Sequence, residues 1–176
     1  YAALDPDGNG LACEALPLGV APAWWTHEIP PGAEPAALIS ISDGDTIHVA
    51  LASGPIVVRL HSIDTPERAQ PWGQQATAAL ARRLRIGTEV TLQPITQDEY
   101  DRLVAVVYLD DENLNAWMVQ QGHAWAYRRY LDDAQYCAWE QQARASRLGV
   151  WSLPPSKRIA PYPVNCLTTP GVAWCS

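Results

Sequence analysis

The sequence predicts an α+β fold that is mainly β, on two observations. Apolar segments with period-two alternation and turn residues between them occupy residues 38–60, 88–94 and 103–109. Three stretches with helical spacing, at 71–85, 114–121 and 133–147, accompany these strands. At 176 residues, the chain fits one domain with extensions and is long enough to bury a core without disulfides or structural metals.

The N-terminal residues 4–14 begin like a calcium loop. The oxygen-bearing side chains of this run are Asp5, Asp7, Asn9 and Glu14. Gly10 follows the alternating oxygens, as in an EF-hand, where glycine permits the sharp turn. A full EF-hand would have glutamate at position 16, where this chain has Leu16, and the run instead resembles the distal half of the extracellular Excalibur motif. Two interpretations stay open: a second calcium site, or an exposed acidic turn.

The folded domain is expected at 37–152, between two proline-rich extensions. Residues 17–37 hold five prolines and no apolar period, which is typical of a linker that lies along a domain. Trp24 and Trp25 in this linker are expected to pack against the domain. We therefore place an N-terminal extension at 1–36 and a cysteine-containing C-terminal extension at 153–176.

The stretch 38–67 places polar groups where a strand would bury only apolar ones. Its alternating apolar residues are Ile39, Ile41, Ile47, Val49 and Leu51, which read as one strand before a turn at 53–55. Residues 56–60 run back, with Arg59 and Val57 on one face. Thr65, Pro66 and Glu67 then leave the sheet as a loop, since proline fixes φ and the residue before it avoids helix.

Two carboxylates in this stretch, Asp45 and Asp64, come from neighbouring strands. With the carbonyl of Thr65 they are hard oxygen ligands of the kind that Ca²⁺ accepts at about 2.3–2.6 Å. His48 and His61 do not share a strand face with these groups in a way that would favour zinc. Taken singly, Asp45 is also a turn residue and Glu67 also a surface charge.

The later elements follow from helical spacing and turn residues. The 71–85 helix buries Ala76, Ala79, Leu80 and Leu84 and ends at Gly87. Its arginines, Arg82, Arg83 and Arg85, are interpreted as a solvated face. The turn 110–113 precedes a helix that Gly122 stops, and Asp132 and Asp133 cap a last helix to Arg147 whose inward residues are Trp139, Ala143 and Leu148.

Arg102 begins the 103–109 strand and has two interpretations. Alone, it is a strand-end arginine paired with Asp98 or Asp101; the second interpretation, contact with a phosphate, is what the resemblance described below implies, and Tyr100 can stack on a base or ribose. The run 123–130 mixes aromatics with arginines as a single-strand groove does, and Tyr127 and Tyr130 are its candidate substrate contacts.

Four ordered motifs resemble the staphylococcal nuclease (thermonuclease) family over roughly 37–152. They are DGDT at 43–46, VVRL at 57–60, IDTPE at 63–67 and YDRLVAVVY at 100–108. The resemblance implies an OB-fold five-stranded β-barrel with three helices, and Ca²⁺-dependent hydrolysis of DNA and RNA. It implies a site of calcium ligands Asp45, Asp64 and Thr65, phosphate-binding Arg59 and Arg102, and general base Glu67. Asp101 stands where the family usually has glycine, a carboxylate beside the phosphate-binding arginine.

Charge and cysteine content define the expected surroundings. A net charge of −7 argues against a broad cationic surface for nucleic acid, and we expect binding to be local, weak, and strongly dependent on salt and calcium. Four cysteines, with no zinc-type spacing, favour a secreted or periplasmic protein whose signal peptide is absent from this chain. Of three possible connectivities we favour Cys166–Cys175 with Cys13–Cys137. No apolar run approaches the length of a membrane helix, and we expect a monomer.

The function predicted is therefore a secreted, sugar-non-specific, calcium-dependent nuclease. A second hypothesis is a catalytically inactive barrel of the same type that binds nucleic acid or a protein partner. A third hypothesis is an extracellular calcium-binding adhesion or wall module. This hypothesis rests on residues 4–14 and does not explain residues 43–67.

Overall fold

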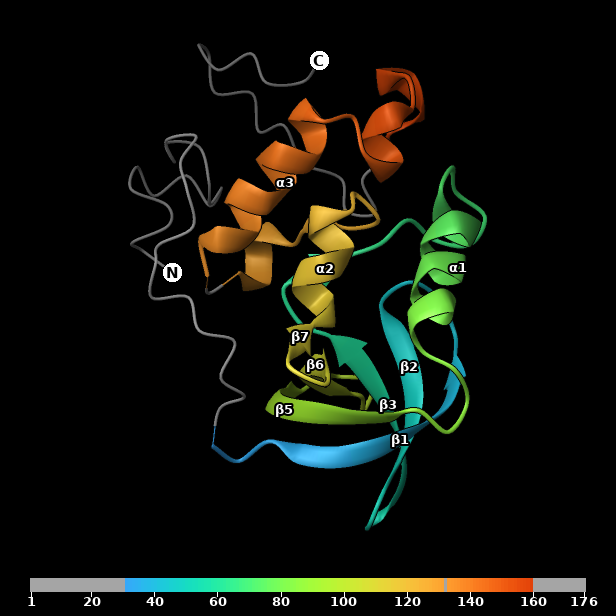
Figure 1. Cartoon of the computed structure of the whole chain (residues 1–176), viewed down its shortest axis with the longest axis vertical. Coiled ribbons are helices and arrows are strands. Elements are labelled where there is room, and N and C mark those ends of the chain that lie inside the picture. The colour runs from blue at the N-terminus through green and yellow to red at the C-terminus, as the bar shows by residue number, and fades with distance from the viewer. Residues whose placement is uncertain (1–30, 132, 160–176) are drawn as a thin grey trace.

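The computed structural model describes residues 31–131 and 133–159 (Figure 1). The strands are β1 Glu34–Ile41, β2 Thr46–Leu51, β3 Gly54–Leu60, β4 Ile63–Asp64, β5 Glu89–Gln97, β6 Leu103–Leu109, β7 Glu112–Asn113 and β8 Trp125–Ala126. The helices are α1 Gly73–Arg83, α2 Leu114–Gln120 and α3 Gln135–Ala145, with 3₁₀ turns η1 Arg128–Tyr130, η2 Gly149–Ser152 and η3 Pro155–Lys157.

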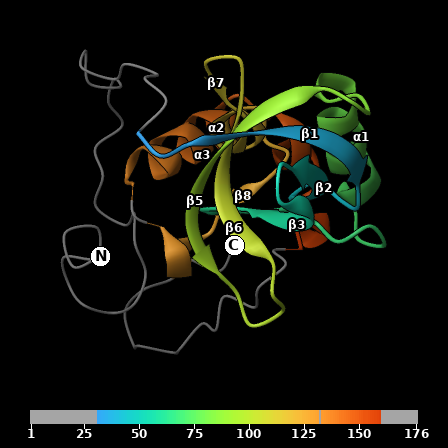
Figure 2. The ribbon, with the colours of Figure 1, turned by 90° about the horizontal axis from the view of Figure 1, so that it is seen from below.

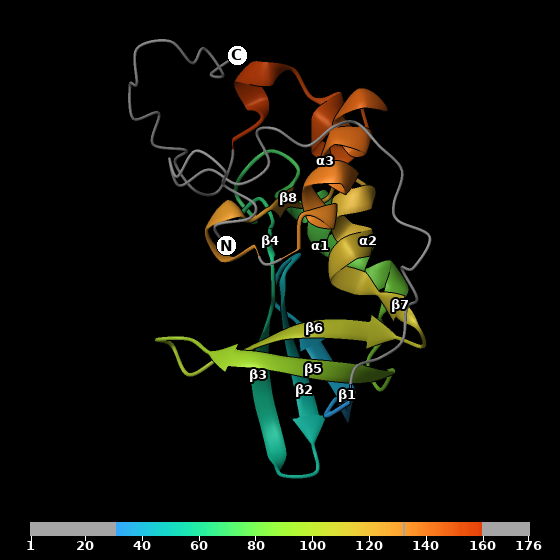
Figure 3. The ribbon, with the colours of Figure 1, turned by 90° about the vertical axis from the view of Figure 1, so that its left-hand side faces the viewer.

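Five strands close into a barrel. Antiparallel pairs join β3 to β2, β2 to β1, β1 to β5 and β5 to β6, and the parallel pair β3–β6 completes the ring. The helices gather at one end of the barrel and the β2–β3 turn lies at the other (Figures 1 and 3), and from below the strands lie in front of the helices (Figure 2). The predicted α+β class, with an OB-type five-stranded barrel and three helices, is confirmed.

The prediction of one continuous strand over 38–51 is wrong. The chain reverses at 42–45, where the backbone N–H groups of Ser42 and Asp43 both donate to the Thr46 carbonyl, at 2.9 and 3.4 Å. The Oδ1 atom of Asp43 also accepts the Asp45 N–H at 3.1 Å, a local turn bond that aspartate provides readily. A register shift between Leu38 and Ser40 turns Ile39 outward, so that 41% of this residue is exposed.

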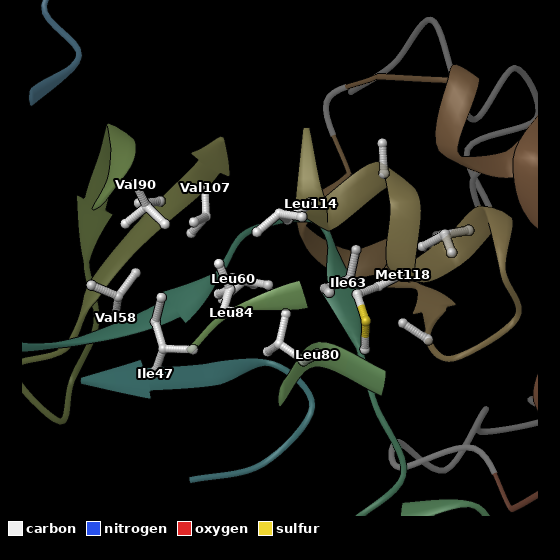
Figure 4. Close-up of a cluster of buried hydrophobic side chains, with 14 of the residues drawn as sticks. Ile47, Val58, Leu60, Ile63, Leu80, Leu84, Val90, Val107, Leu114 and Met118 are labelled. Atoms are coloured by element: carbon white, nitrogen blue, oxygen red, sulfur yellow. The ribbon is translucent and has the colours of Figure 1, made fainter. Parts of the chain in front are cut away.

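The core fills the barrel and continues under the helices. Figure 4 shows residues of β2, β3, β5 and β6 meeting those of α1 and α2, and the labelled side chains are Ile47, Val58, Leu60, Ile63, Leu80, Leu84, Val90, Val107, Leu114 and Met118. Each large side chain buried there stabilises the fold by about 1.5–3 kcal/mol. The four residues predicted for the buried face of α1 are all buried. The helix itself ends at Arg83, before Gly87, which has a φ of 83° in the following turn.

The other two helices begin where the sequence predicted them. Asn113 caps α2 by accepting the Ala116 N–H at 3.0 Å, and Asp133 accepts the Gln135 N–H at 2.8 Å before α3. Trp139 and Ala143 face inward as predicted, but Leu148 does not and is 39% exposed. The helix α3 ends at Ala145, and Arg147 turns the chain with a φ of 52°. The residues that are buried after this turn are therefore Val150 and Trp151.

Several predictions concern residues outside the described ranges. These are the acidic loop with Asp5, Asp7, Asn9 and Glu14, the pair Trp24 and Trp25, Asp132, and the cysteines Cys13, Cys166 and Cys175. Cys137, at the start of α3, is buried, and both proposed cysteine pairings stay predictions, as do the domain boundaries. Across residues 31–131 and 133–159, the helices are too short or too polar to cross a bilayer.

Candidate active site

The three charged residues of the first hairpin meet at the end of the barrel near β4. Thr46 and Arg59 are register partners in the β2–β3 pair, and the Leu60 N–H donates to the Asp45 carbonyl at 2.8 Å. The chain turns at Ser62, with a φ of 63°, and brings Asp64 in β4 back toward them. The site is therefore held by barrel backbone, although its residues come from three segments.

Arg59 bridges the two aspartates. One terminal nitrogen, NH1, lies 3.2 Å from Asp45 Oδ2 and donates to the carbonyls of Leu60 and Ile63, each at 3.0 Å. The other, NH2, donates to Asp64 Oδ1 at 2.8 Å. The guanidinium side chain is only 16% exposed, so these contacts fix its position while its Nε–H and remaining NH2 hydrogen stay available as donors.

Thr65 also fixes Asp45, through the same oxygen that Arg59 contacts. Its backbone N–H and its Oγ1 hydroxyl both donate to Asp45 Oδ2 at 2.8 Å. Gly44 permits this approach, because a Cβ at that position would lie 2.9 Å from Thr65 Cγ2. The carbonyl oxygen of Thr65 is not used by these bonds, which is consistent with the predicted role of that oxygen as a ligand.

The two buried carboxylates hold an excess of negative charge. Burial raises the pKa of Asp45 to about 6, with Arg59 opposing and Asp43 adding to the shift. Burial raises the pKa of Asp64 to about 7, with Arg59 again opposing and the charges of Asp45, Glu67 and Asp43 contributing. A single guanidinium therefore does not neutralise the site, and a further cation would be favoured there.

The donor set fits a hard divalent cation. Within the described residues, Asp45 Oδ1 accepts only a 3.2 Å bond from Thr46, and Asp64 Oδ2 accepts none. All available donors are oxygens, the type that Ca²⁺ and Mg²⁺ prefer. Across residues 31–131 and 133–159, no three His, Cys, Asp or Glu side chains are grouped to hold a metal. The shell of a cation would thus be completed by the Thr65 carbonyl and water.

Glu67 lies exposed on a short, tightly fixed loop beside Asp64. The Glu67 N–H donates to Gln70 Oε1 at 2.9 Å, and the Gln70 N–H returns a bond to the Glu67 carbonyl at 2.8 Å. Gly73 packs so closely against this loop that a Cβ on it would lie 1.9 Å from the backbone carbonyl oxygen of Glu67. Trp72 ends the loop with a φ of 74° and donates its indole N–H to His123 Nδ1 at 3.1 Å. The backbone carrying Glu67 is thus positioned from both ends.

Arg102 adopts the paired arrangement that the sequence left open, with Asp98 as the partner. Its Nε donates to Asp98 Oδ2 at 2.7 Å, and its guanidinium carbon lies 5.4 Å from the Tyr100 ring centroid. In the parallel β3–β6 pair Arg59 is the partner of Val104, so Arg102, two residues earlier, lies on the same face as Arg59. The terminal NH1 and NH2 groups of Arg102 stay available to a phosphate.

Asp101 occupies a left-handed backbone conformation, which glycine adopts without strain. Its φ is 60°, in the left-handed region, which aspartate adopts more readily than most residues. Asp98, three residues earlier in this turn, accepts the Tyr100 and Arg102 N–H groups. Among the described contacts, the ion pair of Arg102 is with Asp98 and not with Asp101.

Tyr127 and Tyr130 lie together beside the β4 strand. Their ring centroids are 5.1 Å apart, and the Tyr127 N–H donates to the Ser62 carbonyl at 2.8 Å. Between them Arg128 pairs with Glu140, which is 1% exposed and also accepts the Ala126 N–H at 3.1 Å. Burial opposes the charge of Arg128, but the Glu140 carboxylate raises the pKa of Arg128 above its usual value. This pair ties β8 to α3.

Sequence reasoning did not assign two of these residues. Asp43 shapes the turn before Asp45, and its charge raises the pKa of both buried aspartates. Its place in the DGD run, two residues before Asp45, was the available signal. Glu140 belongs to no sequence motif that would indicate its role. Its burial follows from the tertiary packing of α3 on β8, which no local pattern predicts.

A closed five-stranded barrel with two aspartates, a bridging arginine and a glutamate loop at one end defines a nuclease-type OB barrel. Residues 57–153 match the family described as staphylococcal nuclease homologue, and the chain belongs to this family.

Proteins with related names match parts of this chain. A "Micrococcal nuclease" of Shigella flexneri is 42% identical over 128 residues, covering 66% of this chain and 73% of that protein. An "Uncharacterized endonuclease" of Haemophilus influenzae is 40% identical over 117 residues, 65% of each chain. A "Probable staphylococcal-like nuclease CAN1" of Oryza sativa subsp. japonica is 34% identical over 95 residues, 54% of this chain and 28% of its own.

Proposed function

We propose that this protein is a calcium-dependent nuclease that hydrolyses phosphodiester bonds of DNA and RNA by attack of water. The observation that carries the proposal is the convergence of Asp45, Arg59 and Asp64, in which one guanidinium bridges two buried carboxylates whose pKa values are raised. Family membership and the names of the relatives support a hydrolase that acts on nucleic acids.

The chain's own residues have distinct tasks in this reaction. A Ca²⁺ ion held by Asp45, Asp64 and the Thr65 carbonyl would supply Lewis acidity toward a phosphoryl oxygen. Arg59 offers its unused Nε–H and NH2 hydrogen to the phosphate, and Arg102, on the same face, offers its terminal nitrogens.

Glu67 is proposed to take the proton from the attacking water. It is exposed beside Asp64, on a loop whose hydrogen bonds restrict its backbone. Tyr100, 71% exposed, and Tyr130, 52% exposed, present rings that can stack on bases without sequence preference, and Tyr127 packs against Tyr130.

Cleavage assays on three substrates test the proposal. Single-stranded DNA, duplex DNA and RNA are incubated with Ca²⁺, with Mg²⁺ and with EDTA, using wild type, Glu67→Gln and Arg59→Gln. Glu89→Gln, an exposed change at the start of β5, is the matched control. We expect cleavage that needs Ca²⁺, survives in the control and falls by about 10²–10³ in each site variant.

Two outcomes would contradict the proposal. Cleavage that persists in EDTA or in both site variants would mean that another site does the chemistry. Retention of nucleic acid without any cleavage would favour an inactive binding module of the same fold.

The cellular setting is proposed from composition. With four cysteines and one methionine, we propose a secreted or periplasmic monomer with disulfides Cys166–Cys175 and Cys13–Cys137. The loop of Asp5, Asp7, Asn9 and Glu14 is proposed as a second calcium site. Mass determination before and after reduction and alkylation, followed by peptide mapping, tests both pairings.

A further inference from the structure

A basic surface follows α3 and is not used by the proposed chemistry. Residues 141–159 contain four cations and no aspartate or glutamate, although the whole chain has a net charge of −7. The four are Arg144, Arg147, Lys157 and Arg158, here called the α3–η3 face. Arg144, Arg147 and Lys157 are exposed, and Arg158 is partly exposed. This segment is therefore locally basic in a chain that is acidic overall.

This face is connected to the active site through two tryptophans. Asp64 of β4 is the direct partner of Trp125 in the antiparallel β4–β8 pair, so both side chains lie on the same side of that small sheet. The Trp125 ring meets Trp151 edge-on, with centroids 5.8 Å apart. Figure 3 shows β4 rising from the barrel to β8, next to the helices.

Two arginines are arranged around Trp151. The guanidinium carbon of Arg144 lies 4.8 Å from the Trp151 ring centroid, and that of Arg158 lies 6.0 Å away. Arg158 is fixed by donating to the carbonyls of Leu153 and Trp151, at 2.8 and 3.0 Å. A guanidinium that stacks on an indole still directs its N–H edges outward, where they match phosphate oxygens.

The cations of this face are not neutralised by the described part of the chain. Arg144, Arg147 and Lys157 have no carboxylate partner within residues 31–131 and 133–159. By contrast, Arg59, Arg83, Arg102 and Arg128 all form ion pairs there. Four further arginines, Arg68, Arg82, Arg85 and Arg129, also have no ion pair in these ranges, so the α3–η3 face is one of several places where uncompensated positive charge is available.

We propose that the α3–η3 face binds phosphates of a single nucleic-acid strand whose cleaved bond lies at Arg59. The strand passes from Asp64 over Trp125 to Arg144 and Arg147, a few nucleotides from the bond that breaks. OB folds contact roughly 4–16 nucleotides of single strand, so a substrate extends beyond the catalytic groups. This inference rests on the proposed function and adds a substrate class: single strands longer than a dinucleotide.

Salt dependence of binding gives a quantitative test. In a Glu67→Gln background with Ca²⁺, fluorescence anisotropy measures binding of a labelled 12-nucleotide oligothymidylate from 0.05 to 0.5 M KCl. Each phosphate contact with a single strand contributes about 0.7 to the slope of log affinity against log salt. We expect Arg144→Gln/Arg147→Gln to reduce the magnitude of the slope by about 1.4. The loss of affinity caused by the two substitutions should therefore be about 25-fold larger at about 0.05 M than at about 0.5 M KCl.

The matched control removes the same charge elsewhere. Arg82→Gln/Arg85→Gln also deletes two exposed arginines, one in α1 and one just after it, outside the α3–η3 face, and should leave the slope unchanged. Cleavage of a dinucleotide by otherwise wild-type Arg144→Gln/Arg147→Gln should match that of the wild type, because so short a substrate does not reach the face. Circular dichroism melting of each variant checks that the folds are intact.

The outcomes separate this inference from the nuclease proposal. Equal slope changes in the two double variants, or equal loss of dinucleotide and 12-nucleotide cleavage, would overturn the inference even if the wild type is an active nuclease. A slope change confined to Arg144→Gln/Arg147→Gln supports the phosphate contacts of the α3–η3 face, whereas absence of cleavage by the wild type would count against the nuclease proposal and leave those contacts established.

Discussion

Replacing Arg59 by glutamine should destabilise the metal-free protein strongly at pH 8 and weakly at pH 5. Burial raises the pKa of Asp45 to about 6 and that of Asp64 to about 7, both above the usual 3.8. Uncharged carboxyls are therefore favoured in the folded state, and their contribution to stability is fully present below about pH 4 and lost as the pH rises through 6 to 7. Arg59 limits that loss by pairing with both ionised groups.

The magnitude follows from the burial of the two partners. Asp45 is 6% exposed and Asp64 8%, so at pH 8 the variant leaves two buried carboxylates without their cation, a change that costs about 3–5 kcal/mol. At pH 5 both groups are largely protonated, and what remains is the loss of hydrogen bonding to the Leu60 and Ile63 carbonyls, about 1 kcal/mol. The difference between the two pH values should therefore be at least about 2 kcal/mol.

Urea unfolding in EDTA at the two pH values measures this difference. Arg102→Gln is the control, because Arg102 and Asp98 form a partly exposed i,i+4 pair that contributes less than about 1 kcal/mol at either pH. Saturating Ca²⁺ at pH 8 should raise the melting temperature of Arg59→Gln more than that of the wild type, since the ion replaces the missing positive charge. Losses at pH 5 and pH 8 that agree within 1 kcal/mol would refute the electrostatic reasoning.

Three further changes test how the site is supported. Gly73→Ala should lower turnover by at least tenfold, since the added Cβ would lie 1.9 Å from the backbone carbonyl oxygen of Glu67 and must move that loop. Ca²⁺ affinity measured by calorimetry should stay near wild type, and unchanged turnover would show that the loop position is unimportant. Glu140→Gln leaves Arg128 without its buried partner and should cost roughly 3 kcal/mol in urea unfolding, so a loss under 1 kcal/mol would count against it. Asn113→Ala removes the cap of α2 and should cost about 1 kcal/mol by the same measurement, with an exposed Gln121→Ala change as the comparison.

The types of the secondary-structure elements and the residues that meet at the site could be predicted, because local sequence patterns indicate them. Helix spacing placed α1 and α2, the strand at 103–109 coincided with β6, and the ordered motifs named Asp45, Arg59 and Asp64, which the structure brings together. What failed depended on backbone reversals. The apolar residues that the sequence analysis used before and after the turn at 42–45 all have odd numbers. The period-two pattern therefore continues through the turn and predicts one strand where the structure has β1 and β2.

Side-chain pairing was beyond the sequence for a different reason. Asp98 and Asp101 are equally plausible partners of Arg102 by spacing, and only the left-handed turn at Asp101 directs the Asp98 carboxylate to Arg102. Likewise, Trp72 and His123 are 51 residues apart, so no local pattern indicates that one holds the other at the end of the Glu67 loop. Contacts between distant segments require the closed barrel first.

An acidic chain can act on a polyanion when its charges are unevenly distributed. The excess negative charge at Asp45 and Asp64 is what makes a divalent cation favourable there, and a bound cation reverses the sign of the potential that a phosphate meets. In the proposal, the α3–η3 face adds positive charge along the path of the strand, joined to Asp64 through Trp125 and Trp151. The net charge of −7 would then keep nucleic-acid binding local, with the substrate held by its contacts near the bond to be broken.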